Sequence, residues 1–178
     1  MDEIKYNYDP KLGEFLSRKG VEEIIDRVQQ EERKLSNKWK GIIICGFAGI
    51  GKSTLARKYA NVVDLESTPF EKDWERYAKV ARHMAENGYT VLLSCHTEIR
   101  KQLHDGYCLA KPRVSDRVEY INRFKVRGND ETFIRMLNQN WEKFLECLPH
   151  ESEYISVPTN LEDALTLKDA EQARVITN

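Results

Sequence analysis

The chain has 178 residues, with 28 basic and 29 acidic side chains, a net charge of -1 and 40% hydrophobic residues. This length suits one domain or one domain with an appendage, and the composition is that of a globular protein rather than a disordered or collagen-like one. The balanced charge argues against a dedicated nucleic-acid binder, because non-specific affinity for nucleic acid depends on an excess of basic groups.

Charge is distributed unevenly along the chain. Residues 100–127 carry eight basic and three acidic groups, a net charge of +5. Residues 128–178 carry four basic and ten acidic groups, a net charge of -6. The basic stretch is too short for a polynucleotide groove, so we expect it to hold a small, highly charged anion.

The cysteines and the apolar stretches indicate the compartment. Cys45, Cys95, Cys108 and Cys147 show neither Cys-x-x-Cys spacing nor a dense framework that would predict disulfides. Uninterrupted apolar stretches are far shorter than the roughly 20 residues of a membrane span. Residues 1–8 are acidic and polar, unlike a signal peptide. We therefore expect a reduced, cytoplasmic protein without a membrane partner.

Short apolar segments alternate with amphipathic ones along the chain. A first predicted helix, 20–35, belongs to a helical extension, residues 1–40, that precedes the main domain, residues 41–178. We predict strands at 42–45, 62–63, 89–95, 107–110 and 154–157. We predict the other helices at 52–60, 71–87, 98–103, 115–126, 130–148 and 161–173. This alternation indicates an α/β fold with a parallel sheet covered by helices on both faces.

One segment carries a specific chemical signature. From Gly46 to Thr54 the chain reads Gly-Phe-Ala-Gly-Ile-Gly-Lys-Ser-Thr and matches G-x-x-x-x-G-K-[ST] in full. The glycines let backbone N–H groups converge on an anion at a helix N-terminus, Lys52 reaches the β- and γ-phosphates, and the Ser53 hydroxyl ligates Mg²⁺. The motif predicts a nucleoside triphosphate site formed by Gly46, Ala48, Gly49, Ile50, Gly51, Lys52, Ser53 and Thr54.

With this loop, the chain resembles the nucleoside monophosphate kinase-like group of P-loop kinases, and within it the short phage- and bacterial-type nucleotide kinases. The resemblance covers about residues 41–173, and its other matches are Asp-Leu-Glu-Ser from Asp64, Ser-Cys-His from Ser94 with Arg100, and Arg123-x-x-x-Arg127. It implies a three-layer P-loop kinase fold with strand order 2-3-1-4-5, ATP and Mg²⁺ as cofactors, an acceptor region at about 64–87 and an arginine-bearing lid at about 112–130.

Asp64 is the candidate carboxylate. It follows the predicted strand 62–63, so we expect it at the carboxyl edge of the sheet, where open α/β sheets bind ligands. It can orient an acceptor hydroxyl, accept its proton or hold Mg²⁺ through water, or be an ordinary cap or turn residue. Many P-loop enzymes have an aspartate for Mg²⁺ after the third strand, where this chain has Ser94, Cys95 and His96. We therefore assign Ser53 and Asp64 as the metal ligands, and His96 either to a phosphate or acceptor contact or to the local backbone.

Arginines complete the catalytic set, because phosphoryl transfer requires positioning and charge neutralisation. Arg123 and Arg127 are four residues apart and project from one helix face. Arg127 precedes Gly128 and Asn129, a turn that can hinge a lid. Arg100 opens a helix where an acceptor phosphate would lie, although each arginine can also be a solvated surface charge. Two further arginines that can reach phosphate are Arg113 and Arg117. The predicted catalytic set is Lys52, Asp64, Arg100, Arg123 and Arg127.

An aromatic stripe follows the acceptor segment. Phe70, Trp74 and Tyr77 recur at helical spacing and are predicted to share one helix face. Such a stripe is either core or a surface on which a nucleobase stacks. The resemblance also places the adenine of ATP against residues 157–160.

We expect a Mg²⁺-dependent kinase that transfers the γ-phosphoryl group of ATP to a nucleoside monophosphate, a deoxynucleotide among the candidates. The alternatives are the same machinery acting on a nucleoside, a sugar acid or a polynucleotide end, and a GTPase-type switch or non-catalytic nucleotide-binding module. The sequence contains neither an Asn-Lys-x-Asp guanine-reading motif nor Asp-x-x-Gly after a strand. Residues 1–40 can pack on the sheet, form a homodimer contact or dock a partner, but their equal numbers of both charges and narrow apolar stripe favour a solvated surface helix.

Overall fold

The computed structural model describes residues 41–165 except residues 60, 147, 149–153 and 158–159. The predicted helix at 20–35 therefore lies outside the described residues, as does the part of the last predicted helix beyond residue 165. None of the helices within the described ranges is long and apolar enough to cross a membrane.

Five parallel strands form one sheet in the order β2-β3-β1-β4-β5, which confirms the predicted α/β class and strand order. The strands are β1 (Ile43–Gly46), β2 (Val62–Asp64), β3 (Thr90–Ser94), β4 (Cys108–Lys111) and β5 (Tyr154–Ser156). Every residue of β1 and β2 is buried. Continuous burial explains why both strands begin with two adjacent β-branched residues, because a parallel strand with helices on both faces has no solvent side.

The described residues form two compact units. The first contains residues 41–46 and 52–108, and the second contains residues 47–51 and the described residues from 109 onward. The helices of the first unit are α3 (Lys52–Lys58), η1 (Thr68–Phe70), α4 (Trp74–Glu86) and α5 (Thr97–Leu103). Those of the second unit are η2 (Val114–Asp116), α6 (Arg117–Val126), α7 (Glu131–Gln139) and α8 (Trp141–Glu146), and residues 161–165 are also helical.

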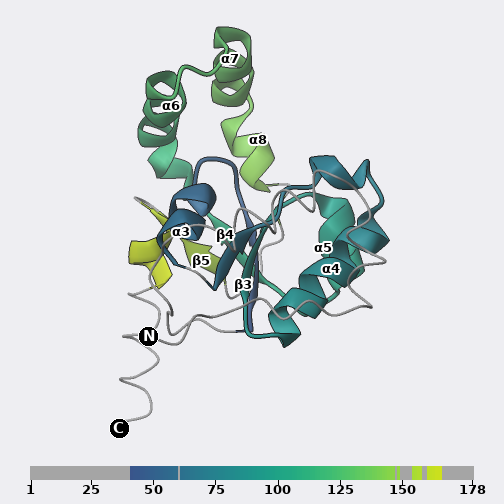
Figure 1. Ribbon diagram of the computed structural model, residues 1–178. Coiled ribbons are helices and arrows are strands. Elements are labelled where there is room, and N and C mark those ends of the chain that lie inside the picture. The colour runs from purple at the N-terminus through teal and green to yellow at the C-terminus, as the bar shows by residue number, and fades with distance from the viewer. Residues whose placement is uncertain (1–40, 60, 147, 149–153, 158–159, 166–178) are drawn as a thin grey trace, which may run out of the picture. The chain divides into compact units, whose positions relative to one another are not determined.

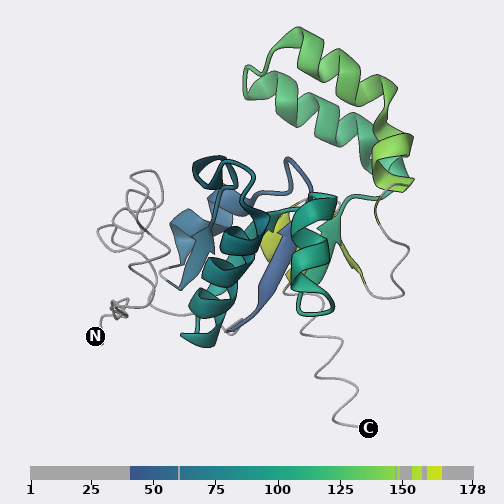
Figure 2. The same cartoon turned by 90° about the vertical axis from the view of Figure 1, so that its right-hand side faces the viewer.

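In the first unit, helices cover both faces of the strands. Figures 1 and 2 show α4 and α5 packed together on one face, and α3 lies on the other. The connection from β1 to β2 crosses the sheet in one direction and the connection from β2 to β3 returns. Because parallel crossovers are right-handed, opposite directions place the connecting helices on opposite faces.

In the second unit, α6 and α7 form an antiparallel hairpin, visible in Figure 2. The turn between them contains Gly128 at φ 74°, in agreement with the predicted turn. Trp141 is fully buried beside it, donates its indole N–H to the carbonyl of Val114 at 2.9 Å, and packs edge-on against Phe47 with 5.6 Å between ring centroids. This indole fixes the base of the hairpin.

The predicted helix 130–148 is wrong as a single element. The chain forms α7 and α8 instead, and Asn140 stands between them. The backbone N–H and the side-chain amide of Asn140 both donate to the carbonyl of Met136, at 3.1 and 2.8 Å, and these bonds close the end of α7.

The predicted helix 71–87 also starts later than expected, at Trp74. Glu71 and Lys72 have φ angles of 49° and 68°, which are left-handed and incompatible with a helix. The Asp73 carboxylate then accepts the N–H of Arg76 at 3.1 Å and caps α4. Phe70 lies before this turn in η1, so the expectation that it shares a helix face with Trp74 and Tyr77 is wrong.

Candidate functional site

The segment with the phosphate-binding signature joins β1 to α3, as predicted. Gly49 and Gly51 have φ angles of 82° and 98°, a left-handed conformation that glycine adopts without the penalty of a Cβ. Lys52 is the first residue of α3, and its Nζ donates to the carbonyl of Gly46 at 3.2 Å. The lysine amine therefore folds back along the loop, toward the end of β1.

Ser53 and Asp64, the two predicted metal ligands, are in contact. The Ser53 hydroxyl donates to Oδ2 of Asp64 at 2.6 Å. Ser53 is exposed at the start of α3, whereas Asp64 ends β2 and is only 9% exposed. A carboxylate and a hydroxyl are hard oxygen ligands, and Mg²⁺ takes few protein ligands together with water and substrate phosphates. The pair thus fits a Mg²⁺ site beside Lys52.

Arg100 lies in α5, and its side chain reaches back to the segment that follows β3. It is only 8% exposed, and its Nε donates to the carbonyl of Cys95 and its Nη2 to Oγ1 of Thr97, both at 3.2 Å. Burial raises the pKa of the Cys95 thiol, while the positive charges of Lys52 and Arg100 oppose this increase. Both cations therefore act on the same small region, and Arg100 is not a solvated surface charge.

The aromatic stripe is divided between core and surface. Phe70 and Tyr77 are buried, with 4.8 Å between their ring centroids. The Tyr77 hydroxyl donates to the carbonyl of Leu65 and accepts the N–H of Ser94 at 3.5 Å, so it ties the end of β2 to the end of β3. Burial raises the pKa of Tyr77 well above its usual range. Trp74, by contrast, remains half-buried.

Within the second unit, α6 packs against the middle of the loop. Arg123 donates from Nη1 to the carbonyl of Gly49 at 3.3 Å and from Nε to Glu119 at 3.1 Å, and its guanidinium carbon lies 4.5 Å from the centroid of the Tyr120 ring. The Phe124 ring lies so close to Gly49 that a Cβ there would be 2.9 Å from Cζ. The predicted lid residue Arg123 therefore contacts the loop backbone.

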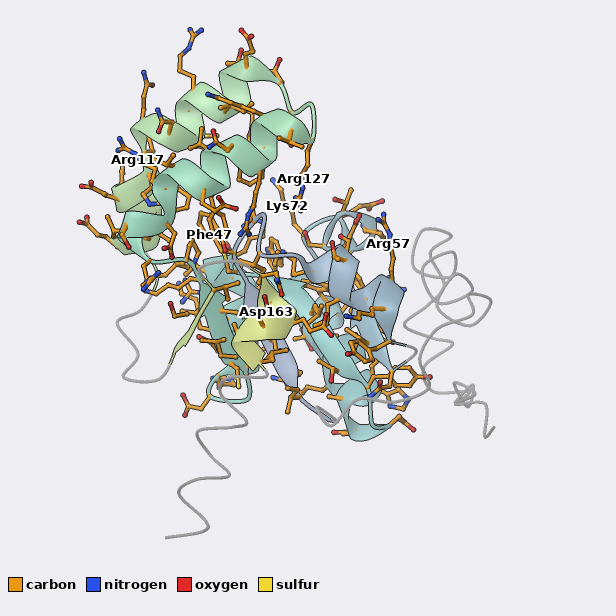
Figure 3. The ribbon with its side chains drawn as sticks, turned by 90° about the vertical axis from the view of Figure 1, so that its left-hand side faces the viewer. Phe47, Arg57, Lys72, Arg117, Arg127 and Asp163 are labelled. Atoms are coloured by element: carbon orange, nitrogen blue, oxygen red, sulfur yellow. The ribbon has the colours of Figure 1, made fainter. Side chains whose placement is uncertain are left out.

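The remaining predicted arginines have different environments. Arg113 forms an ion pair with the buried Asp116, with 3.0 Å between Nη2 and the carboxylate. Its guanidinium group is therefore already bound to a residue of η2. Arg117 and Arg127 are exposed and lie at opposite ends of α6, as Figure 3 shows. Arg127 is one turn beyond Arg123 on the same helix face.

The C-terminal segment also meets the loop in the second unit. The N–H of Leu161 donates to the carbonyl of Ile50 at 3.0 Å, and Asn160 lies 3.9 Å from the Cβ position of Gly51. The Asn160 amide donates to the Asp163 carboxylate at 2.6 Å. Of the segment predicted to meet adenine, residues 158–159 lie outside the described residues.

Sequence reasoning missed the residues that support the loop from outside. Glu119, Tyr120 and Phe124 hold or cover Gly49 and Arg123, and Leu161 binds Ile50. The contacts of Phe124 with Gly49 and of Leu161 with Ile50 join distant segments of the chain, so no local spacing indicates them. Glu119 and Tyr120 contact Arg123 within α6, and the i, i+4 spacing of Glu119 and Arg123 is a signal that the sequence does contain.

Comparisons with protein-family models, with curated proteins and with solved structures found no match to this chain. Its function is therefore inferred from the residues of the site.

Proposed function

We propose that this protein is a Mg²⁺-dependent P-loop kinase that transfers the γ-phosphoryl group of ATP to a nucleoside monophosphate. The observation that carries the proposal is the 2.6 Å hydrogen bond between Ser53 and Asp64, directly after Lys52 in a complete phosphate-loop sequence. A loop and a lysine suffice to bind a triphosphate. A carboxylate beside the metal-binding hydroxyl adds the second protein ligand with which P-loop enzymes hold Mg²⁺ for phosphoryl transfer.

The hydrogen bond that Asp64 accepts from Ser53 favours a phosphate acceptor over a hydroxyl acceptor. A hydroxyl must lose a proton as it attacks, so its kinase needs a general base within hydrogen-bond reach. A monophosphate has its second pKa near 6 and already carries an anionic oxygen at neutral pH. Because Asp64 is engaged by Ser53, its carboxylate suits metal binding rather than proton abstraction.

The other residues have separate roles in this proposal. Bound Mg²⁺ would neutralise charge on the β- and γ-phosphates, with Ser53 and Asp64 as its protein ligands. Lys52 exchanges the Gly46 carbonyl for phosphate oxygens when a nucleotide binds. Arg100, which is fixed before any ligand arrives, supplies positive charge toward the acceptor phosphate. Arg123 and Arg127 supply positive charge from α6.

An ADP-release assay tests the proposal. The wild type is assayed with ATP and Mg²⁺ over a panel of nucleoside and deoxynucleoside monophosphates, nucleosides and sugar acids. We expect ADP formation that depends on a monophosphate and is lost in Lys52→Ala but retained in Lys101→Ala, which removes an exposed lysine of α5. ATP binding without acceptor-dependent turnover would instead identify a nucleotide-binding module, and turnover with nucleosides or sugar acids alone would identify a hydroxyl kinase.

A further inference from the structure

Four rings of the first unit form a continuous series from the core to the surface. The ring centroids are 4.8 Å apart for Phe70 and Tyr77, 6.2 Å for Tyr77 and Trp74, and 5.5 Å for Trp74 and His96. Exposure increases along the series, because Phe70 and Tyr77 are buried, Trp74 is half-buried and His96 is exposed. The inner rings are core, whereas the outer pair, Trp74 and His96, has aromatic surface that solvent reaches.

This outer pair lies at the same edge of the sheet as the candidate metal site. Tyr77 binds the carbonyl of Leu65, the residue after Asp64, and Trp74 packs on Tyr77 one helical turn earlier. His96 follows β3 by two residues and is the N-cap residue that precedes α5. The pair therefore borders the region that receives an acceptor if Asp64 and Ser53 hold the metal.

A strained turn sets the position of Trp74. Glu71 and Lys72 are consecutive non-glycine residues in the left-handed region, a conformation that L-residues with a side chain adopt rarely. Lys72 is exposed at this turn and is labelled in Figure 3. Residues held in such conformations cluster at ligand clamps and active sites. Here the turn ends η1 and makes Trp74 the first residue of α4.

We propose that Trp74 and His96 form the stacking surface for the base of the acceptor nucleotide. This inference rests on the proposed kinase function and adds that a planar aromatic base, not only the sugar phosphate, is recognised. Stacking of a base on an aromatic side chain contributes about 1–3 kcal/mol in single-stranded complexes. The tilt of 50° between the two rings leaves them as adjoining walls, with the indole as the larger.

The test measures acceptor affinity in two ways, by calorimetric titration without ATP and by the acceptor KM. The variants are Trp74→Leu, Trp74→Phe and His96→Ala, and the matched control is Phe144→Leu, which removes a 37% exposed ring from α8. Each protein is titrated with the best nucleoside monophosphate of the panel and with 2-deoxyribose 5-phosphate, which has no base. Thermal melts confirm that each variant folds.

We expect Trp74→Leu to weaken nucleoside monophosphate binding by about 5- to 150-fold, the fold-change that corresponds to the stacking energy. Trp74→Phe keeps a ring and stays within about threefold of the wild type, His96→Ala has an intermediate effect, and binding of 2-deoxyribose 5-phosphate is the same in all variants. Equal affinity of the wild type and Trp74→Leu for the nucleotide would overturn the inference while leaving the kinase proposal intact. A wild type that turns over none of the monophosphates would overturn the kinase proposal itself.

Discussion

The Ser53–Asp64 hydrogen bond joins residues that are eleven positions apart, one at the start of α3 and one at the end of β2. It gives Asp64 a partner in the absence of metal, so a buried carboxylate is not left unsatisfied. The same oxygens are then in place when a cation arrives. A substitution that keeps the shape of Asp64 but removes its negative charge therefore tests whether the residue binds the cation.

We predict that Asp64→Asn raises the Mg²⁺ concentration for half-maximal activity by about 10- to 100-fold, the usual effect of removing a supporting carboxylate from a metal site. The amide keeps an oxygen that can accept from Ser53 but lacks the negative charge. A Mg²⁺ titration of ADP formation measures the effect. Asp105→Asn, at an exposed position between α5 and β4, serves as the control and should match the wild type. Identical titrations for the two variants would remove Asp64 from the metal site.

A second residue-scale prediction concerns pH. Burial raises the pKa of Tyr120 to about 12, and its hydroxyl donates to the carbonyl of Val157 at 2.6 Å. Below pH 10 both the folded and the unfolded protein keep this proton. Between pH 10 and 12 the unfolded chain loses it first, so the free energy of unfolding falls as the pH rises. Urea unfolding at pH 9, 10 and 11 should show a smaller decrease in Tyr120→Phe than in the wild type; parallel decreases would contradict the buried hydroxyl.

At the scale of secondary-structure elements, α6 packs so closely on the loop that Gly49 has no room for a side chain. Gly49 and Gly128 are both left-handed, at 82° and 74°, but a Cβ at Gly49 would meet Phe124 whereas a Cβ at Gly128 meets nothing within 4 Å. We predict that Gly128→Ala costs about 1 kcal/mol of stability through backbone strain alone. Gly49→Ala should cost about 1–3 kcal/mol more because of overpacking. Urea unfolding of both variants measures the difference, and equal losses would show that α6 does not constrain the loop.

The two ends of α6 provide a test of the proposed lid. Arg117 and Arg127 are both exposed but are separated by about 15 Å along the helix axis. We predict that Arg127→Ala lowers kcat by about 10³-fold, at the lower end of the effect of a catalytic arginine, with much less change in ATP affinity. Arg117→Ala should leave both quantities near the wild-type values. Equal activity of the two variants in the ADP-release assay would remove Arg127 from the catalytic set.

At the scale of the whole molecule, the net charge of +5 on residues 100–127 overstates how many basic side chains can bind a ligand, because several of them already have partners within the protein. Arg100 binds the carbonyl of Cys95, Arg113 binds Asp116 and Arg123 binds Glu119. Charges engaged in this way are unsuited to tracking a long polyanion. The site for one nucleotide that we propose needs no groove for a polyanion, and nucleotide binding there would stabilise the folded protein by mass action.

We therefore predict that ATP and Mg²⁺ at about 100 times the dissociation constant stabilise the wild type by about 2.7 kcal/mol. For a chain of this size, the melting temperature should rise by about 5–10 °C. Lys52→Ala should show little of this increase, and a thermal melt with and without nucleotide measures both. An equal increase in both proteins would mean that ATP binds somewhere other than the loop.

The sequence predicted the strands well because burial on both faces leaves a strong apolar pattern, as in β1 and β2. It assigned Ser53 and Asp64 to one metal site, because Ser53 belongs to the phosphate-loop motif and Asp64 follows a strand, but it did not predict the hydrogen bond between them. It could not predict the break at Asn140 or the left-handed turn at Glu71 and Lys72, since local propensity there favours a continuous helix. Nor could it predict that Arg123 binds Gly49, because that contact depends on tertiary packing.

The support of the loop has a consequence for folding. Within the second unit, the N–H of Phe47 donates to the carbonyl of Ala110, Arg123 donates to Gly49 and Leu161 donates to Ile50. The Arg123–Gly49 contact alone spans 74 positions, and contacts between distant residues form late because long segments must first be closed. On a ribosome that adds about 5–20 residues per second, the phosphate loop is synthesised several seconds before its last support. The nascent chain therefore acquires a fully supported loop only once residue 161 has emerged, and the nucleotide binding that we propose would reach its full affinity at that point.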